Sequence, residues 1–227
     1  MTFVMTESKQ QILSIVDKLG VVNTEQLRTI TGMNVNTLYK GLRILSRENL
    51  IKKTDLVING KGGIYIITQR GSEWCGAINL SFRSSQKVPN VSILRHTLLV
   101  NDMIIYYKKL FKEEQNEDVT IMTERELLVE EIGKGRRSKK VVDTLPDFVF
   151  EQASGRKSAI EVELSRKRPD RLEKKLRAYK EQVQQGIYFN VAYCYDDPAV
   201  ARLVKRYADK VGLPVIFDDM NEALGGE

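Results

Sequence analysis

The apolar positions in the first part of the chain recur with the period of a helix. Within residues 7–19 they return every three or four positions, which predicts an amphipathic helix that ends at Gly20. A short second helix is predicted over the segment EQLRTIT, with Thr24 as its N-cap and Gly32 after its last turn. The pattern therefore predicts two helices in direct succession.

A third helix and a hairpin follow. The helix is capped by Asn34 or Asn36 and is expected to run to about Asn49, with one apolar stripe and a polar face opposite to it. Two β-rich runs, LIKKTDLVI and IYIIT, then flank Asn59-Gly60, a pair typical of a tight hairpin because both residues tolerate positive φ. Three helices followed by a hairpin are the elements of a winged helix-turn-helix.

The pattern changes after residue 80. Residues 81–91 are polar and contain Pro89, so we expect them to link a domain of residues 1–80 to a domain of residues 92–227. The second domain is predicted to begin with a helix from Ser92 to about Glu114 and to continue as helices flanking one sheet, an α/β (α+β) arrangement. Its expected strands lie within 118–128 (where a strand leads into a polar stretch), 145–152, 158–164, 187–195 and 213–217, and helices are capped by Asp170 and Asp197.

The net charge is unevenly distributed along the chain. The 227 residues include 36 Lys and Arg against 30 Asp and Glu, which is a net charge of +6. Residues 1–80 carry +4 of this excess, whereas residues 119–227 carry only +1 because clustered acids and clustered bases cancel. A basic excess in the predicted winged helix is compatible with a nucleic-acid partner.

Composition excludes several classes of protein. An apolar share of 42% and a charged share of 29% are ordinary for a globular protein and argue against a disordered, collagen-like or disulfide-stabilised chain. The sequence lacks a run of about 18 apolar residues, so we expect no membrane partner. The N-terminus does not resemble a secretory signal, and Cys75 and Cys194 are too far apart for a metal-binding motif. A cytoplasmic protein is therefore expected.

Three carboxylates fall on two neighbouring predicted strands. Alternation places Glu161 and Glu163 on one face of their strand, and Asp147 on the face opposite to the phenylalanines of the preceding strand. If three or five residues connect the strands, Asp147 falls opposite one of the glutamates; if four do, the cluster disperses. A converged trio would suit Mg²⁺ or Mn²⁺, with Asp147 and Glu161 as ligands. The alternative is a set of surface carboxylates paired with the arginines that follow.

The same region resembles the core of the PD-(D/E)xK nuclease superfamily. The resemblance rests on Pro146-Asp147, on the ExE motif of residues 161–163 and on the basic helix after it. It implies a restriction-endonuclease-like mixed-sheet domain with Asp147, Glu161 and Glu163 as the catalytic residues of a Mg²⁺- or Mn²⁺-dependent DNA endonuclease. Glu163 occupies the position of the superfamily's lysine, a departure that favours an inactive domain. Lys167, Lys174 and Lys175 are the candidates for a displaced cation.

A narrower resemblance covers roughly residues 7–195 and points to the plasmid replication-relaxation family. It implies a DNA-binding role in the replication, relaxation or mobilisation of a plasmid or mobile element, with relaxase or replication proteins as partners. The matching elements are His96, Glu124-Arg125-Glu126, Pro146-Asp147, Glu161-Val162-Glu163 and Leu176-Arg177-Ala178-Tyr179.

Candidate DNA contacts lie on the third helix and the wing. In a winged helix this helix enters the major groove, where Asn and Arg can contact bases, while wing lysines meet phosphates. The candidates are Asn34, Asn36, Thr37, Lys40, Arg43, Arg47, Lys52, Lys53 and Lys61. Phosphate contacts in the second domain are expected from the basic loop 133–140 and the segment after Glu163: Arg136, Arg137, Lys139, Lys140, Arg166 and Lys167.

Three functions remain open on the sequence alone. The first is a sequence-specific double-stranded DNA-binding protein whose inactive nuclease-like domain serves dimerisation or partner docking. The second is a metal-dependent DNA nicking enzyme or nuclease. The third is a homodimeric winged-helix transcription regulator, with the long helix 92–114 as its dimer interface.

Overall fold

The computed structural model describes residues 3–58, 60, 63–75, 90–135 and 143–225. The chain packs into two compact units, Met1–Ile105 and Tyr106–Glu227, whose boundary lies inside the long helix α5 (Val91–Gln115). Most of the predicted linker, residues 81–89, lies outside the described residues. None of the described helices is long and apolar enough to cross a membrane.

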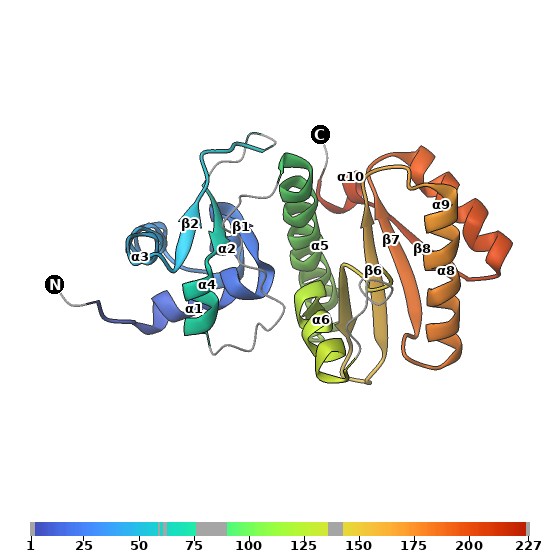
Figure 1. Cartoon of the computed structure of the whole chain (residues 1–227), viewed down its shortest axis with the longest axis horizontal. Helices are drawn as coiled ribbons and strands as arrows, with labels where there is room; N and C mark the ends of the chain where they lie inside the picture. The colour runs from blue at the N-terminus through green and yellow to red at the C-terminus, as the bar shows by residue number, and fades with distance from the viewer. Residues whose placement is uncertain (1–2, 59, 61–62, 76–89, 136–142, 226–227) are drawn as a thin grey trace. The chain divides into compact units, whose positions relative to one another are not determined.

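The first unit consists of helices packed on a three-stranded antiparallel sheet (Figure 1). The strands are arranged in the order β1-β3-β2, so that the last strand in sequence lies in the middle. The three predicted helices and the two predicted strands are present in the predicted order. The elements before α5 are α1 (Glu7–Leu19), β1 (Val21–Asn23), α2 (Thr24–Thr31), α3 (Val35–Arg47), β2 (Ile51–Lys53), β3 (Ile64–Ile67) and α4 (Gln69–Trp74).

The structure shows that the predicted N-cap of α2 is wrong, and it decides between the two predicted N-caps of α3. The N-cap of α2 is Asn23 and not Thr24, because the Asn23 side chain accepts a hydrogen bond from the Gln26 amide and Gln26 bonds back to the Asn23 amide. The N-cap of α3 is Asn34, whose side chain accepts from the Asn36 amide at 2.8 Å. Gly32 lies between the two helices with φ +64°, where a residue with a side chain would be strained.

The strands β2 and β3 form a short antiparallel pair. Lys53 lies opposite Tyr65, which is the last pair toward Asn59-Gly60 in the described part of the chain. Asn59 itself lies outside the described residues. The strand β1 and the helix α4 were not predicted, because three and six residues are too few to show a strand or helix period.

Polar bonds attach the first part of α5 to the first unit. The Gln26 side chain donates to the Leu98 carbonyl at 2.7 Å, and the buried Asn101 side chain donates to the Val21 carbonyl at 2.7 Å. These bonds hold α2 and β1 against α5.

Gly71 in α4 is a position that cannot accept a side chain. A Cβ there would lie 1.9 Å from the Leu50 carbonyl oxygen and 2.8 Å from Ile67 Cδ1. Because backbone cannot rotate away, Gly71→Ala is expected to lower the free energy of unfolding by about 2–3 kcal/mol in chemical denaturation followed by circular dichroism. Gly133→Ala is the control, since no heavy atom lies within 4 Å of its Cβ position. Equal stability of the two variants would contradict this prediction.

The second unit is built on a five-stranded mixed sheet in the order β4-β5-β6-β7-β8. The pairs β4–β5 and β5–β6 are antiparallel, whereas β6–β7 and β7–β8 are parallel. This confirms the predicted α/β class with a mixed sheet. After α5 the elements are β4 (Thr120–Thr123), α6 (Glu124–Gly133), β5 (Phe148–Glu151), β6 (Lys157–Glu163), α8 (Pro169–Gln184), β7 (Asn190–Tyr195), α9 (Pro198–Val211), β8 (Ile216–Asp219) and α10 (Met220–Ala223).

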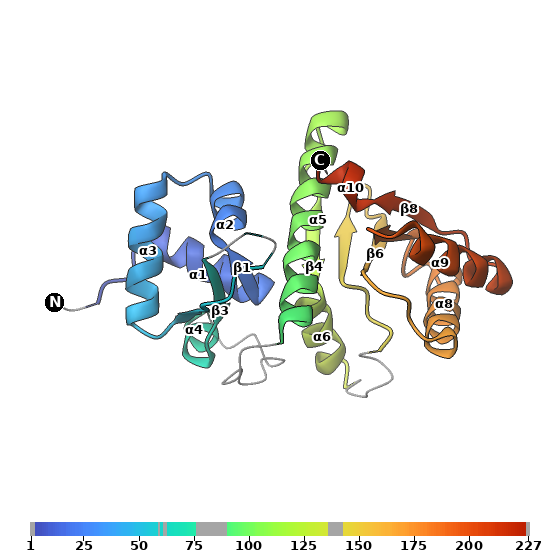
Figure 2. The same cartoon turned by 90° about the horizontal axis from the view of Figure 1, so that it is seen from above.

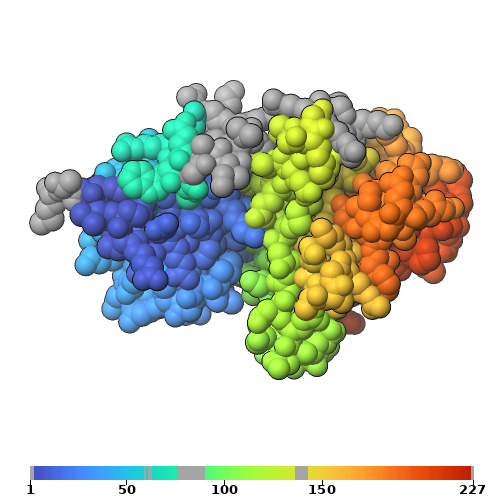
Figure 3. Space-filling view, turned by 90° about the horizontal axis from the view of Figure 1, so that it is seen from below, coloured from blue at the N-terminus to red at the C-terminus, as the bar shows by residue number. Residues whose placement is uncertain are grey.

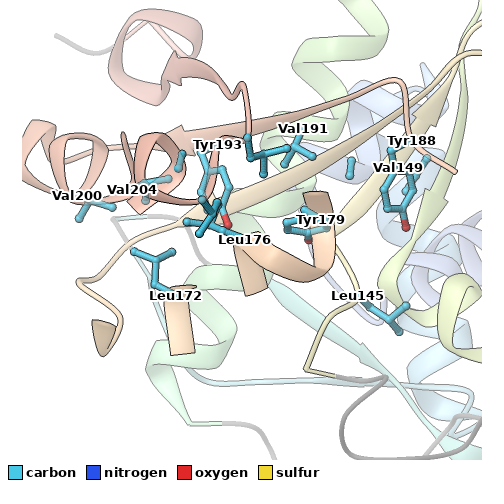
Figure 4. Close-up of a cluster of buried hydrophobic side chains, with 14 of the residues drawn as sticks. Leu145, Val149, Leu172, Leu176, Tyr179, Tyr188, Val191, Tyr193, Val200 and Val204 are labelled. Atoms are coloured by element: carbon cyan, nitrogen blue, oxygen red, sulfur yellow. The ribbon is translucent and has the colours of Figure 1, made fainter. Parts of the chain in front are cut away.

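Helices cover both faces of this sheet (Figures 1 and 2). On one face, Tyr107 and Phe111 of α5 pack on Phe150, with ring centroids 5.4 and 4.9 Å from its own. On the other, α8 and α9 contribute Leu172, Leu176, Val200 and Val204 to a buried core (Figure 4). The two glutamates belong to β6, and Asp147 directly precedes β5.

One further helix was not predicted, and one further predicted helix start was wrong. The polar stretch after β4 is the helix α6, begun by a capping box in which the Thr123 side chain accepts from the Glu126 amide. The N-cap of α8 is Arg168 and not Asp170, because Pro169 occupies the first helical position, where its fixed φ favours a helix start.

Candidate functional site

The outer face of α3 carries a continuous polar stripe. Asn36, Lys40 and Arg43 are exposed and spaced four and three residues apart, so their side chains leave the same side of the helix. The opposite side is buried through Leu38, Leu42 and Leu45. Packing of the apolar side therefore turns the polar stripe outward.

The other candidates on α3 differ in their surroundings. The Asn34 side chain is used as the helix cap, and the Arg47 guanidinium contacts Glu48 at 3.0 Å, which neutralises part of its charge. Thr37 is exposed but lies about a quarter turn from the stripe. Asn36, Lys40 and Arg43 are thus the members of this set that the stripe brings together.

Basic side chains also lie on β2 and on α2. Lys52 and Lys53 are exposed on β2, whereas Lys61 lies outside the described residues. Lys53 lines a hollow of about 560 Å³ together with Arg28 of α2 and Tyr39 of α3. Arg28 was not among the predicted contacts, because these were expected only on the third helix and the hairpin that follows it.

The strand register brings the three carboxylates to one face of the sheet in the second unit. Five residues, 152–156, connect β5 to β6, and this turn lies at the surface (gold in Figure 3). With this odd number, Asp147 lies opposite Glu161: its amide donates to the Ile160 carbonyl at 3.0 Å, and its carboxylate accepts from the Val162 amide at 2.7 Å. The connection is one of the two lengths for which convergence was predicted.

Tyrosines complete this face from β7 and α8. Tyr193 pairs with Glu161 in the parallel β6–β7 register, so both side chains leave the same face. The Tyr179 hydroxyl of α8 donates to the Glu161 carboxylate. Figure 4 shows the rings of Tyr179 and Tyr193 in the space between α8 and the sheet.

The glutamates are buried and paired with lysines, and are not surface groups paired with arginines. Glu161 is 1% exposed and Glu163 is 4% exposed. The Lys175 ammonium lies 2.7 Å from Glu161, and the Lys167 ammonium lies 2.5 Å from Glu163 and 3.7 Å from Glu161. Two of the three lysines named from the sequence therefore supply cations, whereas Lys174 is exposed.

The protonation equilibria follow from this burial. Burial raises the pKa of Glu163, and the adjacent Lys167 only partly offsets that effect. Burial alone would lower the pKa of Lys167, but Glu161 and Glu163 outweigh it and raise that pKa above its usual value. Lys167 therefore remains an ammonium ion throughout the neutral range.

The cluster does not form a ready metal site. Glu161 and Glu163 already bind ammonium groups, and within the described ranges no three His, Cys, Asp or Glu side chains are grouped so that they could share an ion. The observed contacts thus do not fit Mg²⁺ or Mn²⁺. Among the predicted phosphate contacts, Arg166 is exposed and Lys167 is paired with Glu163, while Arg136, Arg137, Lys139 and Lys140 lie outside the described residues.

Comparison with known families identifies the chain. The model of the family described as "Replication-relaxation" matches residues 13–193, which is most of the sequence. The chain belongs to the replication-relaxation family. Membership indicates a role in the replication or relaxation of a plasmid or mobile element. None of the curated proteins compared with it matches the chain.

The replication-relaxation match ends at Tyr193. It therefore includes Asp147, Glu161 and Glu163, which are called the carboxylate row from here on. The resemblance drew attention to Tyr179 without giving it a contact, and Tyr193 was missed. A signal for α8 was available: Leu172, Lys175, Leu176 and Tyr179 follow the spacing of one helix face, which predicts that Lys175 faces the sheet. No local pattern indicated that Tyr193 lies beside Glu161, because that pairing is set by the register between the strands β6 and β7.

Stability of this replication-relaxation protein should fall in alkaline solution. Burial, with a smaller effect of Glu131 and Glu161, raises the pKa of Tyr188 from 10.0 to about 12. A raised tyrosine pKa means that the fold favours the neutral phenol, so its contribution is complete below pH 10 and is lost as pH rises to 12. The loss is up to about 3 kcal/mol. Urea denaturation at several pH values measures it, and Tyr188→Phe should reduce the pH dependence; an unchanged slope would contradict the assignment.

Proposed function

We propose that this protein binds double-stranded DNA sequence-specifically, with α3 in the major groove, as part of plasmid or mobile-element replication, relaxation or mobilisation. The observation that carries the proposal is the outward polar stripe of Asn36, Lys40 and Arg43 on the second helix of a helix–turn–helix segment. The first unit then acts as a winged helix.

The side chains of the stripe have the chemistry that base recognition requires. Arg43 can donate two parallel hydrogen bonds to guanine, and Asn36 can both donate to and accept from adenine. Within the described part of the chain, Lys40 and Arg43 form no ion pair, so both charges remain available to the polyanion. Lys52 and Lys53 on β2 are exposed and would meet phosphates beside the groove.

The second unit is proposed to be a nuclease-like domain that does not cleave DNA. Glu163 stands where the superfamily has a lysine, and the lysines beside Glu161 and Glu163 neutralise the groups that would bind a metal. The domain would then serve as a scaffold for partner proteins. Hydrolysis by metal-activated water is disfavoured in this arrangement, since the carboxylates are engaged elsewhere.

Two measurements test the proposed function. Binding to labelled duplex DNA is expected to weaken steeply as salt increases, because protein cations displace condensed counterions. Failure to bind any duplex at low salt would reject the winged-helix assignment. Supercoiled plasmid incubated with Mg²⁺ or Mn²⁺ is expected to remain supercoiled; nicking that disappears in Asp147→Ala would instead establish the nuclease function.

A further inference from the structure

The hollow beside α3 carries positive charge that the polar stripe does not include. It has a volume of about 560 Å³, and its lining comes from α2, α3, β2 and β3. Arg28 and Lys53 contribute two exposed cations to this lining, and Glu25 contributes one carboxylate. In the described part of the chain neither cation forms an ion pair, whereas Glu25 has an interaction of its own. The two cations are therefore available to an anion that enters the hollow.

Two phenols share this lining with the cations. Tyr65 lies opposite Lys53 in the β2–β3 register, so both side chains leave the same face of the sheet. Burial raises the pKa of Tyr65, and Tyr39 of α3 raises it further, which places the two hydroxyl groups within electrostatic reach of each other. A phenol hydroxyl can donate a hydrogen bond to a phosphate oxygen. The hollow thus combines two charged donors with two neutral ones.

The hollow adjoins the side of α3 that carries the stripe. Val35 and Tyr39 are four residues apart and line the hollow from one flank of the helix. Tyr39 lies about 100° around the helix from Lys40 of the stripe. The major groove of B-DNA is about 12 Å wide, so a helix inside it has a phosphate backbone along each flank. With the stripe directed at the bases, one of these backbones would pass over the hollow.

We propose that the hollow binds a backbone phosphate of the DNA through Arg28 and Lys53, with Tyr39 and Tyr65 as hydrogen-bond donors. This site rests on the proposed function, because that function places α3 in the major groove. Phosphates are the same at every nucleotide, so the contact carries no base preference and fixes the position of α3 along the groove. Arg28 is then a DNA contact from α2, outside the reading helix.

The salt dependence of binding tests the loss of one phosphate contact. Each phosphate that a protein neutralises contributes about 0.9 to the slope of log K against log salt concentration. Arg28→Gln is expected to lower that slope by about this amount and to weaken binding about tenfold, equally for a duplex selected from a random-sequence pool and for its scrambled version. Arg70→Gln is the matched control, since Arg70 is exposed on α4 and is not part of the lining.

Substituted duplexes test whether the two cations bind the same phosphate. In the selected duplex, one phosphate at a time is replaced by an uncharged methylphosphonate. The wild-type protein is expected to lose affinity at a phosphate where Arg28→Gln and Lys53→Gln both show no further loss, because each variant already lacks that contact. Circular dichroism is expected to show the wild-type fold for both variants, since both residues are exposed.

The results distinguish this site from the proposed function. If the wild-type protein bound no duplex, the proposed function would fail and the phosphate site with it. If the wild-type protein bound duplex DNA but the salt slope were unchanged in Arg28→Gln, only the phosphate site would be rejected. An equal loss in Arg70→Gln, or different phosphates for Arg28→Gln and Lys53→Gln, would also overturn it.

Discussion

Replacing Asn36 and Arg43 by alanine together is expected to weaken binding to a preferred duplex about a hundredfold or more. Each side chain can form a bidentate contact with a base edge, and such contacts contribute about 1–3 kcal/mol of discrimination. Neither residue is buried, so the variant should keep the stability of the wild-type protein. The effect should therefore appear in affinity and not in folding.

The measurement requires a defined probe and a matched charge control. A duplex enriched by the wild-type protein from a random-sequence pool serves as the probe, and fluorescence anisotropy gives its dissociation constant. Lys205→Ala removes one exposed positive charge on α9 and is expected to change that constant only slightly. If both variants lost affinity equally, α3 would not be the reading helix.

Glu161→Gln is expected to destabilise the second unit by about 3–5 kcal/mol. Removing the charge leaves Lys175, with a side chain only 14% exposed, facing a neutral amide in a buried place, and a buried cation without its partner costs this much. The amide still accepts from the Tyr179 hydroxyl, so the variant tests the ion pair and not the packing. The change would be measured as a shift of the urea midpoint.

Glu173→Gln provides the control for this prediction. Like Glu161, Glu173 contacts two cations, Arg177 at 2.7 Å and Lys210 at 2.6 Å, but its pairs lie on the solvent side of α8. Surface ion pairs contribute little because water screens them. A midpoint unchanged in both variants would mean that the buried cluster does not stabilise the fold.

Local pattern was sufficient for most elements of the fold. The sequence shows the apolar stripes of α1, α3 and α9. It also shows the glycines that follow α1 and α9 and the one that precedes α3, and it shows Asp197 and Pro198 at the start of α9. Errors occurred where competing caps were adjacent, as with Asn23 and Thr24, because only the completed hydrogen bonds distinguish them. The elements β1, α4 and α10 were missed since each contains less than two periods, and α6 was interpreted as a polar stretch.

The two candidate sites also differ in how far local sequence pattern could predict them. The polar stripe of α3 was predictable, because helix period alone decides which residues share a face. The carboxylate row was only a conditional prediction, since it depended on whether the connection from β5 to β6 held an odd or even number of residues. The burial of Glu161 and Glu163 contradicts the alternative of surface carboxylates, because α8 covers that face of the sheet.

The sequence by itself determined the replication-relaxation resemblance, the helical stripes and the excess of positive charge in the first 80 residues. Each of these depends on residue identity and short-range spacing. Only the tertiary structure decided that Asp147 lies opposite Glu161, that Tyr193 joins them from β7, and that Lys167 takes the shared position between the glutamates. Such contacts join residues distant in the chain, and strand register and helix packing place them, not local propensity.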